Sequence, residues 1–166
     1  MGIFEQPFHQ IAMYVQDPDQ SVKVMREMGY ENWVYDEADL VGDVQGEAIS
    51  THGRMWFNYE FDGRELEFLH YEGPSWHSFD GRTTADGYAT QPFLSHKSVY
   101  VDNLGATCEK LERLGLVAVQ RFETQNHINK HLLDKHERFR EAVYGTRHVF
   151  GFDIKLIQRI FDDVPV

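Results

Sequence analysis

Apolar and polar residues alternate along residues 10–15, a pattern that predicts a β-strand with one packed face and one polar face. The same alternation returns at residues 96–101. Each strand is followed by a helical stretch that ends in a glycine, and the steps from Val15 to Gly29 and from Val101 to Gly115 are both 14 residues. A repeat in such register predicts two copies of one supersecondary unit.

Further extended segments follow the first helix, at residues 32–35, 54–61 and 65–71. An Asp-Gly pair at residues 62–63 is typical of a hairpin turn between the last two. Each half of the chain therefore has the order strand, helix and three strands. The predicted fold class is α+β, with two βαβββ modules that form a paired half-barrel and with helices outside it that start near Asp19 and near Asn103.

The repeat makes residues 1–166 a single domain of two halves. We expect module one at about residues 5–72, a linker that crosses the surface at residues 73–91, and module two at about residues 92–162 with a His-rich insertion at residues 125–140. The linker is long enough for the halves to pair within one chain or between two chains. We also expect a homodimer.

Composition narrows the choice of partners. The formal net charge is -11, and the lysines and arginines are scattered along the chain. A nucleic-acid partner is therefore not expected, because binding to phosphates requires clustered positive charge. The single cysteine, Cys108, lies at an apolar position of the second helix and is expected in the core. We found no signal-peptide pattern and no membrane-spanning stretch, so a cytoplasmic protein without a membrane partner is expected.

The period of two along each strand indicates which side chains share a face. When residues 63–70 are aligned with residues 151–158, Glu67 corresponds to Lys155. If each half curls into a half-barrel, Gln10, Glu67, His96 and Lys155 converge from four strands. The first three offer an amide oxygen, a carboxylate and an imidazole, which are acceptable ligands for a divalent ion, whereas an ammonium group is not.

These residues carry a resemblance to a known family. Gln10 and His96 each stand five positions before a valine on the first strand of a half, and Glu67 lies in a fourth strand similar to Gly-x-x-Ile-Glu-Leu. With the duplicated modules, this pattern resembles the vicinal oxygen chelate superfamily of glyoxalase I, fosfomycin-resistance proteins, extradiol dioxygenases and methylmalonyl-CoA epimerase. The resemblance covers nearly the whole chain apart from the His-rich insertion. Residues 96–110 look most like the second half of glyoxalase I.

The resemblance implies metal ligands at Gln10, Glu67 and His96. The fourth ligand of the superfamily is a glutamate in the last strand, where this chain has Lys155. The implied function is that of a glyoxalase-like, divalent-metal-dependent enzyme that acts on a small oxygenated organic molecule, as a lyase, isomerase or dioxygenase. Glu67 and Lys155 would be its catalytic residues. An imidazole ligand favours Fe, Mn, Ni or Zn over Mg.

The presence of Lys155 is compatible with two interpretations of the site. In one, a metal is bound and the ammonium group of Lys155 donates hydrogen bonds to a bound anion or oxyanion. In the other, Lys155 pairs directly with Glu67, and the chain is a non-catalytic small-molecule-binding or resistance protein with a metal-free cavity. Measuring the metal content separates the two readings.

Other histidines and aromatic residues receive a plainer interpretation. His127 and His131 have the i, i+4 spacing of metal ligands on a helix, but no carboxylate is placed as a third ligand. A solvated helix or loop is therefore the favoured interpretation of the insertion. Trp76 and His77, in the linker, are expected to border the cavity.

Overall fold

The computed structural model describes residues 3–4, 6–129 and 137–161. Its strands and helices, in chain order, are β1 Gln10–Tyr14, α1 Pro18–Glu27, β2 Trp33–Val44, β3 Glu47–Phe61, β4 Arg64–Glu72, α2 Trp76–Phe79, β5 Phe93–Tyr100, α3 Leu104–Arg113, β6 Ala118–Gln125, β7 Glu137–Tyr144, α4 Arg147–Phe150 and β8 Asp153–Phe161. The predicted βαβββ order is present in both halves, with the short helices α2 and α4 added.

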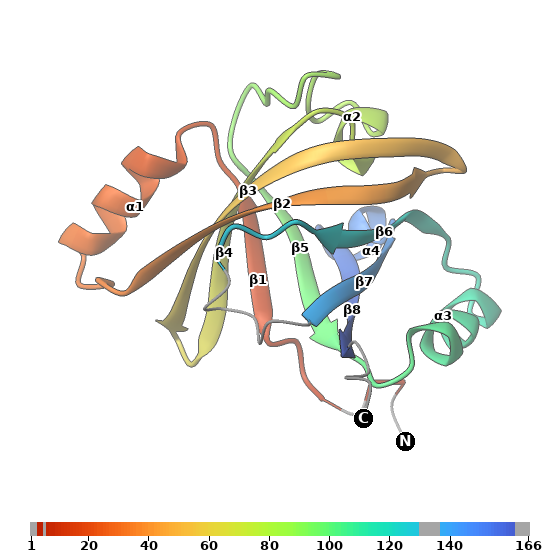
Figure 1. Ribbon diagram of the computed structural model, residues 1–166. Coiled ribbons are helices and arrows are strands. Elements are labelled where there is room, and N and C mark those ends of the chain that lie inside the picture. The colour runs from red at the N-terminus through yellow and green to blue at the C-terminus, as the bar shows by residue number, and fades with distance from the viewer. Residues whose placement is uncertain (1–2, 5, 130–136, 162–166) are drawn as a thin grey trace, which may run out of the picture.

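The strands form one closed barrel in the order β1-β4-β3-β2-β6-β7-β8-β5 (Figure 1). The two modules meet at two seams, where β1 pairs with β5 and β2 pairs with β6, both antiparallel. The predicted pairing of two βαβββ modules is therefore confirmed. It occurs within a single chain.

The register confirms the internal repeat. In module one, β1 runs parallel to β4 with Ala12 opposite Glu67, and in module two β5 runs parallel to β8 with Ser98 opposite Lys155. At the seam between β1 and β5, Gln10 lies opposite Ser98 and Ala12 lies opposite His96. Glu67 and Lys155 thus occupy equivalent positions in the two modules.

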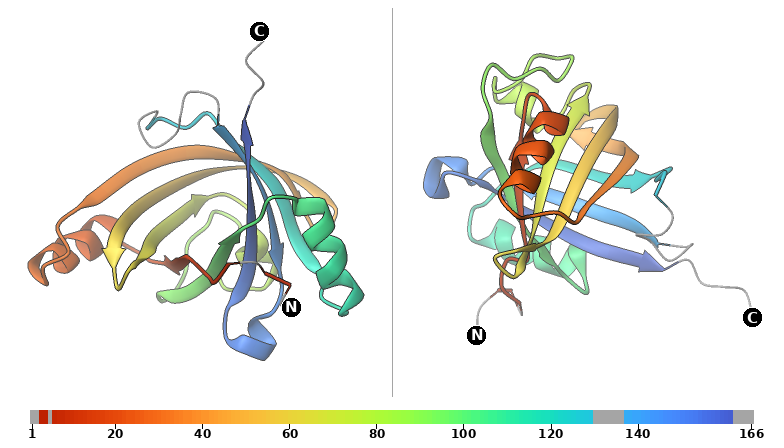
Figure 2. Two further views of the ribbon diagram at one scale, coloured as in Figure 1. Left: turned by 90° about the horizontal axis from the view of Figure 1, so that it is seen from below. Right: turned by 90° about the vertical axis from the view of Figure 1, so that its left-hand side faces the viewer.

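The two long helices lie outside the barrel on opposite sides of it (Figures 1 and 2). Each begins after a side chain that accepts a backbone N–H, Asp17 from Gln20 and Asn103 from Ala106, both at 2.9 Å. Cys108 is buried on the inner face of α3, as predicted. Among the described residues, no helix has the length and apolar character needed to span a membrane.

The hairpin formed by β2 and β3 is much longer than predicted. The segments expected at residues 32–35 and 54–61 are only the ends of strands of 12 and 15 residues. Gln45 and Gly46 make the turn between these strands with φ of 52° and 86°, the left-handed values that a tight hairpin requires. The acidic residues along β2 had hidden its alternation from the sequence interpretation.

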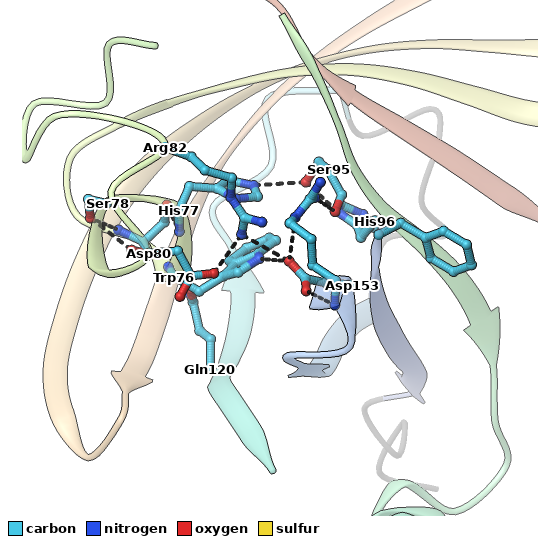
Figure 3. A network of polar contacts seen from close by, with 12 residues as sticks. Trp76, His77, Ser78, Asp80, Arg82, Ser95, His96, Gln120 and Asp153 are labelled. Carbon is cyan, nitrogen blue, oxygen red and sulfur yellow. Dashed lines mark hydrogen bonds and ion pairs between the residues drawn. The ribbon is translucent and has the colours of Figure 1, made fainter. Parts of the chain in front are cut away.

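The linker does not simply cross the surface, which corrects that prediction. Trp76 and His77 on α2 are both 0% exposed. The indole of Trp76 packs with Tyr14, Leu40 and Leu69 in one core cluster. Its Nε1 donates to Asp153 Oδ2 at 3.0 Å, and its backbone N–H donates to Gln120 Oε1 at 2.9 Å (Figure 3). The linker therefore helps to fill the barrel interior and does not border the cavity described below.

Candidate functional site

A cavity of about 450 Å³ lies in the part of the barrel that these core residues do not fill. This volume suits a small organic molecule. The lining residues come from all eight strands of the barrel and from the segment after β6: Gln10, Asp36, Met55, Phe57, Tyr59, Glu65, Glu67, Tyr100, Thr124, His127, Phe139, Glu141, Lys155, Ile157 and Arg159.

The structure brings the four predicted site residues close to one another. Gln10, Glu67 and Lys155 line the cavity, while His96 lies just behind Glu67. His96 Nε2 is 3.5 Å from Glu67 Oε2, and neither atom has a hydrogen-bond partner. On the far side of the ring, His96 Nδ1 lies 2.8 Å from the hydroxyl of Ser95, which also contacts His77 Nε2 at 2.8 Å (Figure 3).

Lys155 pairs with Glu141 and not with Glu67, which corrects the direct pairing considered above. Its Nζ lies 3.1 Å from Glu141 Oε2, and both side chains are buried. Burial alone would lower the pKa of Lys155, but the Glu141 and Glu67 carboxylates raise that pKa above its ordinary value. The cavity wall therefore carries a charged ammonium group that Glu141 holds in place.

Glu67 and His96 are both fully buried. Burial raises the pKa of the Glu67 carboxyl, and the nearby Lys155 ammonium offsets part of that rise. Burial holds the pKa of His96 well below its ordinary value, and Lys155 lowers it further. His96 is therefore a neutral imidazole at pH 7, and Glu67 holds a proton more readily than an exposed glutamate does.

Glu65 is a second carboxyl group beside Glu67. It accepts a short hydrogen bond from the amide nitrogen of Gln10, whose oxygen accepts from the Ser98 hydroxyl at 2.5 Å. Burial raises the pKa of Glu65 to about 7, and repulsion from Glu67 adds to the rise. The two carboxyl groups lie two residues apart on one face of β4, so the negative charge of one disfavours ionisation of the other.

The side chains at the predicted metal site do not provide enough ligands for a metal ion. Glu67 Oε2 and His96 Nε2 face each other without partners, as two ligands of one ion would. However, the amide oxygen of Gln10 is turned to Ser98, and Lys155 brings a buried positive charge. In the described part of the chain, no three His, Cys, Asp or Glu side chains are grouped so as to hold an ion. Two donors fall short of the three protein ligands of a typical catalytic site.

Sequence reasoning missed several residues of the cavity, three of which carry a carboxyl or imidazole group. Glu141 lies on β7, just after the segment taken as an insertion, and Asp36 lies on the missed part of β2. The third is His127, which was interpreted as solvated but lies in the cavity wall with its side chain 10% exposed. His131, its predicted neighbour on a helix, lies outside the described residues. Ala38 and Leu40 follow Asp36 at a period of two, and this spacing is the sequence signal that could have placed Asp36 on the inner face of β2.

Aromatic residues make up much of the remaining wall. Phe57 and Tyr59 come from β3, Tyr100 from β5 and Phe139 from β7. The guanidinium group of Arg159 lies 4.5 Å from the centre of the Tyr100 ring, an arrangement that favours a cation–π contact. A ligand in this cavity therefore meets flat apolar surfaces beside a polar cluster.

Several solved structures are similar to this chain over most of its length. A hypothetical protein of Bacillus halodurans is 11% identical with a TM-score of 0.50, and 96% of this chain and 98% of that one are covered. A mutant 4-hydroxymandelate synthase of Streptomyces coelicolor is 14% identical with a TM-score of 0.50. The match covers 96% of this chain and 50% of the synthase. Methylmalonyl-CoA epimerase of Mycobacterium tuberculosis is 13% identical with a TM-score of 0.47, and 91% of this chain and 86% of that one are covered.

No protein-family model matches the chain, and no curated protein sequence matches it. The structural likeness, together with the paired βαβββ modules, gives the fold but no activity. The chain therefore has the predicted glyoxalase-like fold.

Proposed function

We propose that the chain is an enzyme that moves a proton on a small oxygenated molecule, in the manner of an isomerase or lyase. One observation carries the proposal. Glu67, a buried carboxyl with an unpartnered oxygen and a raised pKa, lines the same cavity as the Lys155 ammonium group that Glu141 holds in place. A base beside a fixed positive charge is the arrangement that removes a proton next to a carbonyl group.

The residues have separate roles in this reaction. Glu67 in its carboxylate form takes a proton from the carbon next to the substrate carbonyl. The electron pair of the broken C–H bond moves to the carbonyl oxygen, and Lys155 donates a hydrogen bond to the enolate that forms. Glu141 keeps Lys155 charged. The aromatic wall holds the body of the substrate and excludes water, which strengthens these interactions.

Replacing Glu67 with glutamine tests the proposal, because an amide cannot accept the proton. The assay follows exchange of carbon-bound protons for deuterium in heavy water by proton NMR, with a panel of small 2-hydroxy and 2-oxo carbonyl compounds. We expect the wild type to exchange at least one member of the panel, and Glu67→Gln to be about 10²–10⁴-fold slower. Exchange at equal rates by the two proteins would refute the role of Glu67.

A divalent-metal-dependent enzyme is a second candidate, which the unpartnered pair of Glu67 Oε2 and His96 Nε2 favours. Glu67 and His96 would hold the ion, joined by Gln10 once its amide has rotated. The ion, Fe, Mn, Ni or Zn, would act as a Lewis acid. This metal assignment stays a prediction.

A non-catalytic protein that binds a small molecule is a third candidate. The buried ion pair of Lys155 and Glu141 favours it, since a charge-neutral pair is suited to a cavity without metal. A binding protein would retain a member of the panel without exchanging its protons. Small-molecule binding is common to all three candidates, and a homodimer stays a prediction.

A further inference from the structure

Two fully buried histidines share one serine hydroxyl behind the cavity. Ser95 Oγ lies 2.8 Å from His77 Nε2 and 2.8 Å from His96 Nδ1 (Figure 3). All three residues are 0% exposed. The other nitrogen of His96, Nε2, lies 3.5 Å from Glu67 Oε2. A buried relay of His77, Ser95 and His96 therefore leads from α2 to the proposed base on β4.

Packing alone does not explain the imidazole of His77. Its ring centroid lies 4.0 Å from that of Trp76, 5.0 Å from that of Phe93 and 5.4 Å from that of Tyr14. Its Nδ1 is buried without a hydrogen-bond partner among the described residues, which costs free energy that a phenylalanine at this place would not cost. The contact of Nε2 with Ser95 is the feature that a phenylalanine would lack.

The number of protons in the buried relay is limited. Burial holds the pKa of both imidazoles well below the ordinary value, so each ring is neutral and carries one N–H. The Ser95 hydroxyl has one proton. It donates to one ring and accepts from the other, because accepting from both would leave its own buried proton without an acceptor. Two directions are possible, and each fixes the tautomer of both histidines.

The unpartnered nitrogen of His77 determines the direction. If Ser95 donated to His77 Nε2, the N–H of His77 would be on Nδ1, buried without an acceptor. Buried N–H groups without an acceptor are rarer than buried acceptors without a donor. His77 therefore donates from Nε2 to Ser95, and Ser95 donates to His96 Nδ1. The N–H of His96 is then on Nε2, which faces Glu67.

We propose that His77 and Ser95 are positioning residues that hold His96 in the tautomer with its N–H on Nε2, aimed at Glu67. This inference rests on the proposed function, in which Glu67 is the base, and adds the residues that orient it. At 3.5 Å the contact between His96 and Glu67 is longer than a normal hydrogen bond, and such contacts tighten when substrate binds. The contact fixes Oε2 and leaves Oε1 to take the substrate proton.

The same tautomer bears on the metal-dependent candidate. A metal ion binds the lone pair of an imidazole nitrogen that carries no proton. With its N–H on Nε2, His96 offers no lone pair toward Glu67, so binding an ion requires the buried relay to reverse. Ser95 would then donate to His77, whose Nδ1 would carry the buried N–H without an acceptor. The direction of the relay therefore favours the proton-transfer enzyme.

The direction is tested without a substrate. Two-dimensional NMR of ¹⁵N-labelled protein at neutral pH distinguishes a protonated Nδ1 from a protonated Nε2, and each ring is assigned through its own backbone signals. We expect His77 and His96 both to carry the proton on Nε2 in the wild type. A proton mainly on Nδ1 of either ring would overturn the proposal, and on His96 it would leave Nε2 free for a metal ion.

Ser95→Ala tests whether the hydroxyl orients the rings. Without it, neither nitrogen of His77 has a partner, so we expect both tautomers of this ring to be populated. His70→Phe is the matched control, since His70 packs against the same Tyr14 ring, with centroids 5.7 Å apart, but makes no hydrogen bond to Ser95 in the described structure. We expect this control to keep the wild-type tautomers. A single Nε2–H tautomer of His77 in Ser95→Ala would contradict the proposal.

The positioning role is tested by deuterium exchange with the member of the carbonyl panel that reacts fastest. His77 and Ser95 do not line the cavity, so Ser95→Ala and His77→Phe should lower kcat about 10-fold while KM changes by less than about 2-fold. General damage to the cavity would change KM as well. A wild-type kcat in both variants would overturn the positioning role.

The two tests keep the inference separate from the proposed function. If the wild type exchanges no member of the panel, the proposed function fails for that class of compound. The tautomers of His77 and His96 then decide alone whether the buried relay is directed toward Glu67.

Discussion

Replacing Lys155 with methionine should lower the free energy of unfolding by about 3–5 kcal/mol near pH 7. Methionine keeps most of the apolar length of the side chain but removes the charge. Glu141, which is buried and 3.1 Å from Lys155 Nζ, would then be a buried carboxylate without its partner. The loss should shrink at low pH, because a protonated Glu141 no longer needs the ammonium group. Denaturant unfolding at pH 5 and pH 7 measures both effects.

Two controls separate the ion pair from general damage. The double variant Lys155→Met/Glu141→Leu removes both charges and should recover most of the lost stability, since apolar replacements of a buried pair are often neutral or stabilising. Lys110→Met changes a lysine on the exposed face of α3 and should stay within about 0.5 kcal/mol of the wild type. If Lys155→Met were as stable as Lys110→Met, the buried pair would have no role in the fold.

Replacing Glu65 with glutamine should flatten the pH dependence of stability. The pKa of Glu65 is about 7 in the folded protein and close to the ordinary 4.5 in the unfolded chain. Between these values the folded state binds more protons, so the wild type should lose stability as the pH rises, by about 3 kcal/mol in total from this residue. The loss is complete above pH 7 and absent below pH 4.5.

Thermal or denaturant unfolding of the wild type and Glu65→Gln from pH 4 to pH 8 measures the difference. Glutamine carries no charge at any of these pH values, so the variant should be the more stable protein at pH 8. Glu67 also has a raised pKa, and it is present in both proteins. Glu109→Gln, at an exposed site on α3, serves as the control. An unchanged slope in Glu65→Gln would show that Glu65 is not desolvated in the folded protein.

The sequence predicts the parts of the site that depend on local periodicity. The repeat and the period of two along β1, β4 and β8 placed Gln10, Glu67 and Lys155 on cavity-facing positions, as the structure confirms. Side-chain direction within a strand follows from the backbone alone, which is why a single sequence suffices for these positions.

The partners of these residues depend on contacts distant in sequence. Glu141 reaches Lys155 only because β7 pairs with β8, and Asp36 reaches His127 across 91 residues of chain. The linker around Trp76 has the Gly- and Ser-rich composition of a surface loop, yet tertiary packing buries its indole in the barrel. No short-range pattern records such contacts.

The most direct test of the account is the ion content of protein purified without an affinity tag and without chelator, and then incubated with Fe, Mn, Ni or Zn and desalted. Lys155 supplies the positive charge, and among the described residues two unpartnered donors, Glu67 Oε2 and His96 Nε2, face each other. We therefore predict well below one bound ion per chain, together with proton exchange that survives chelator. About one tightly bound ion per chain, lost in His96→Ala, would contradict the account and establish the metal-dependent enzyme in its place.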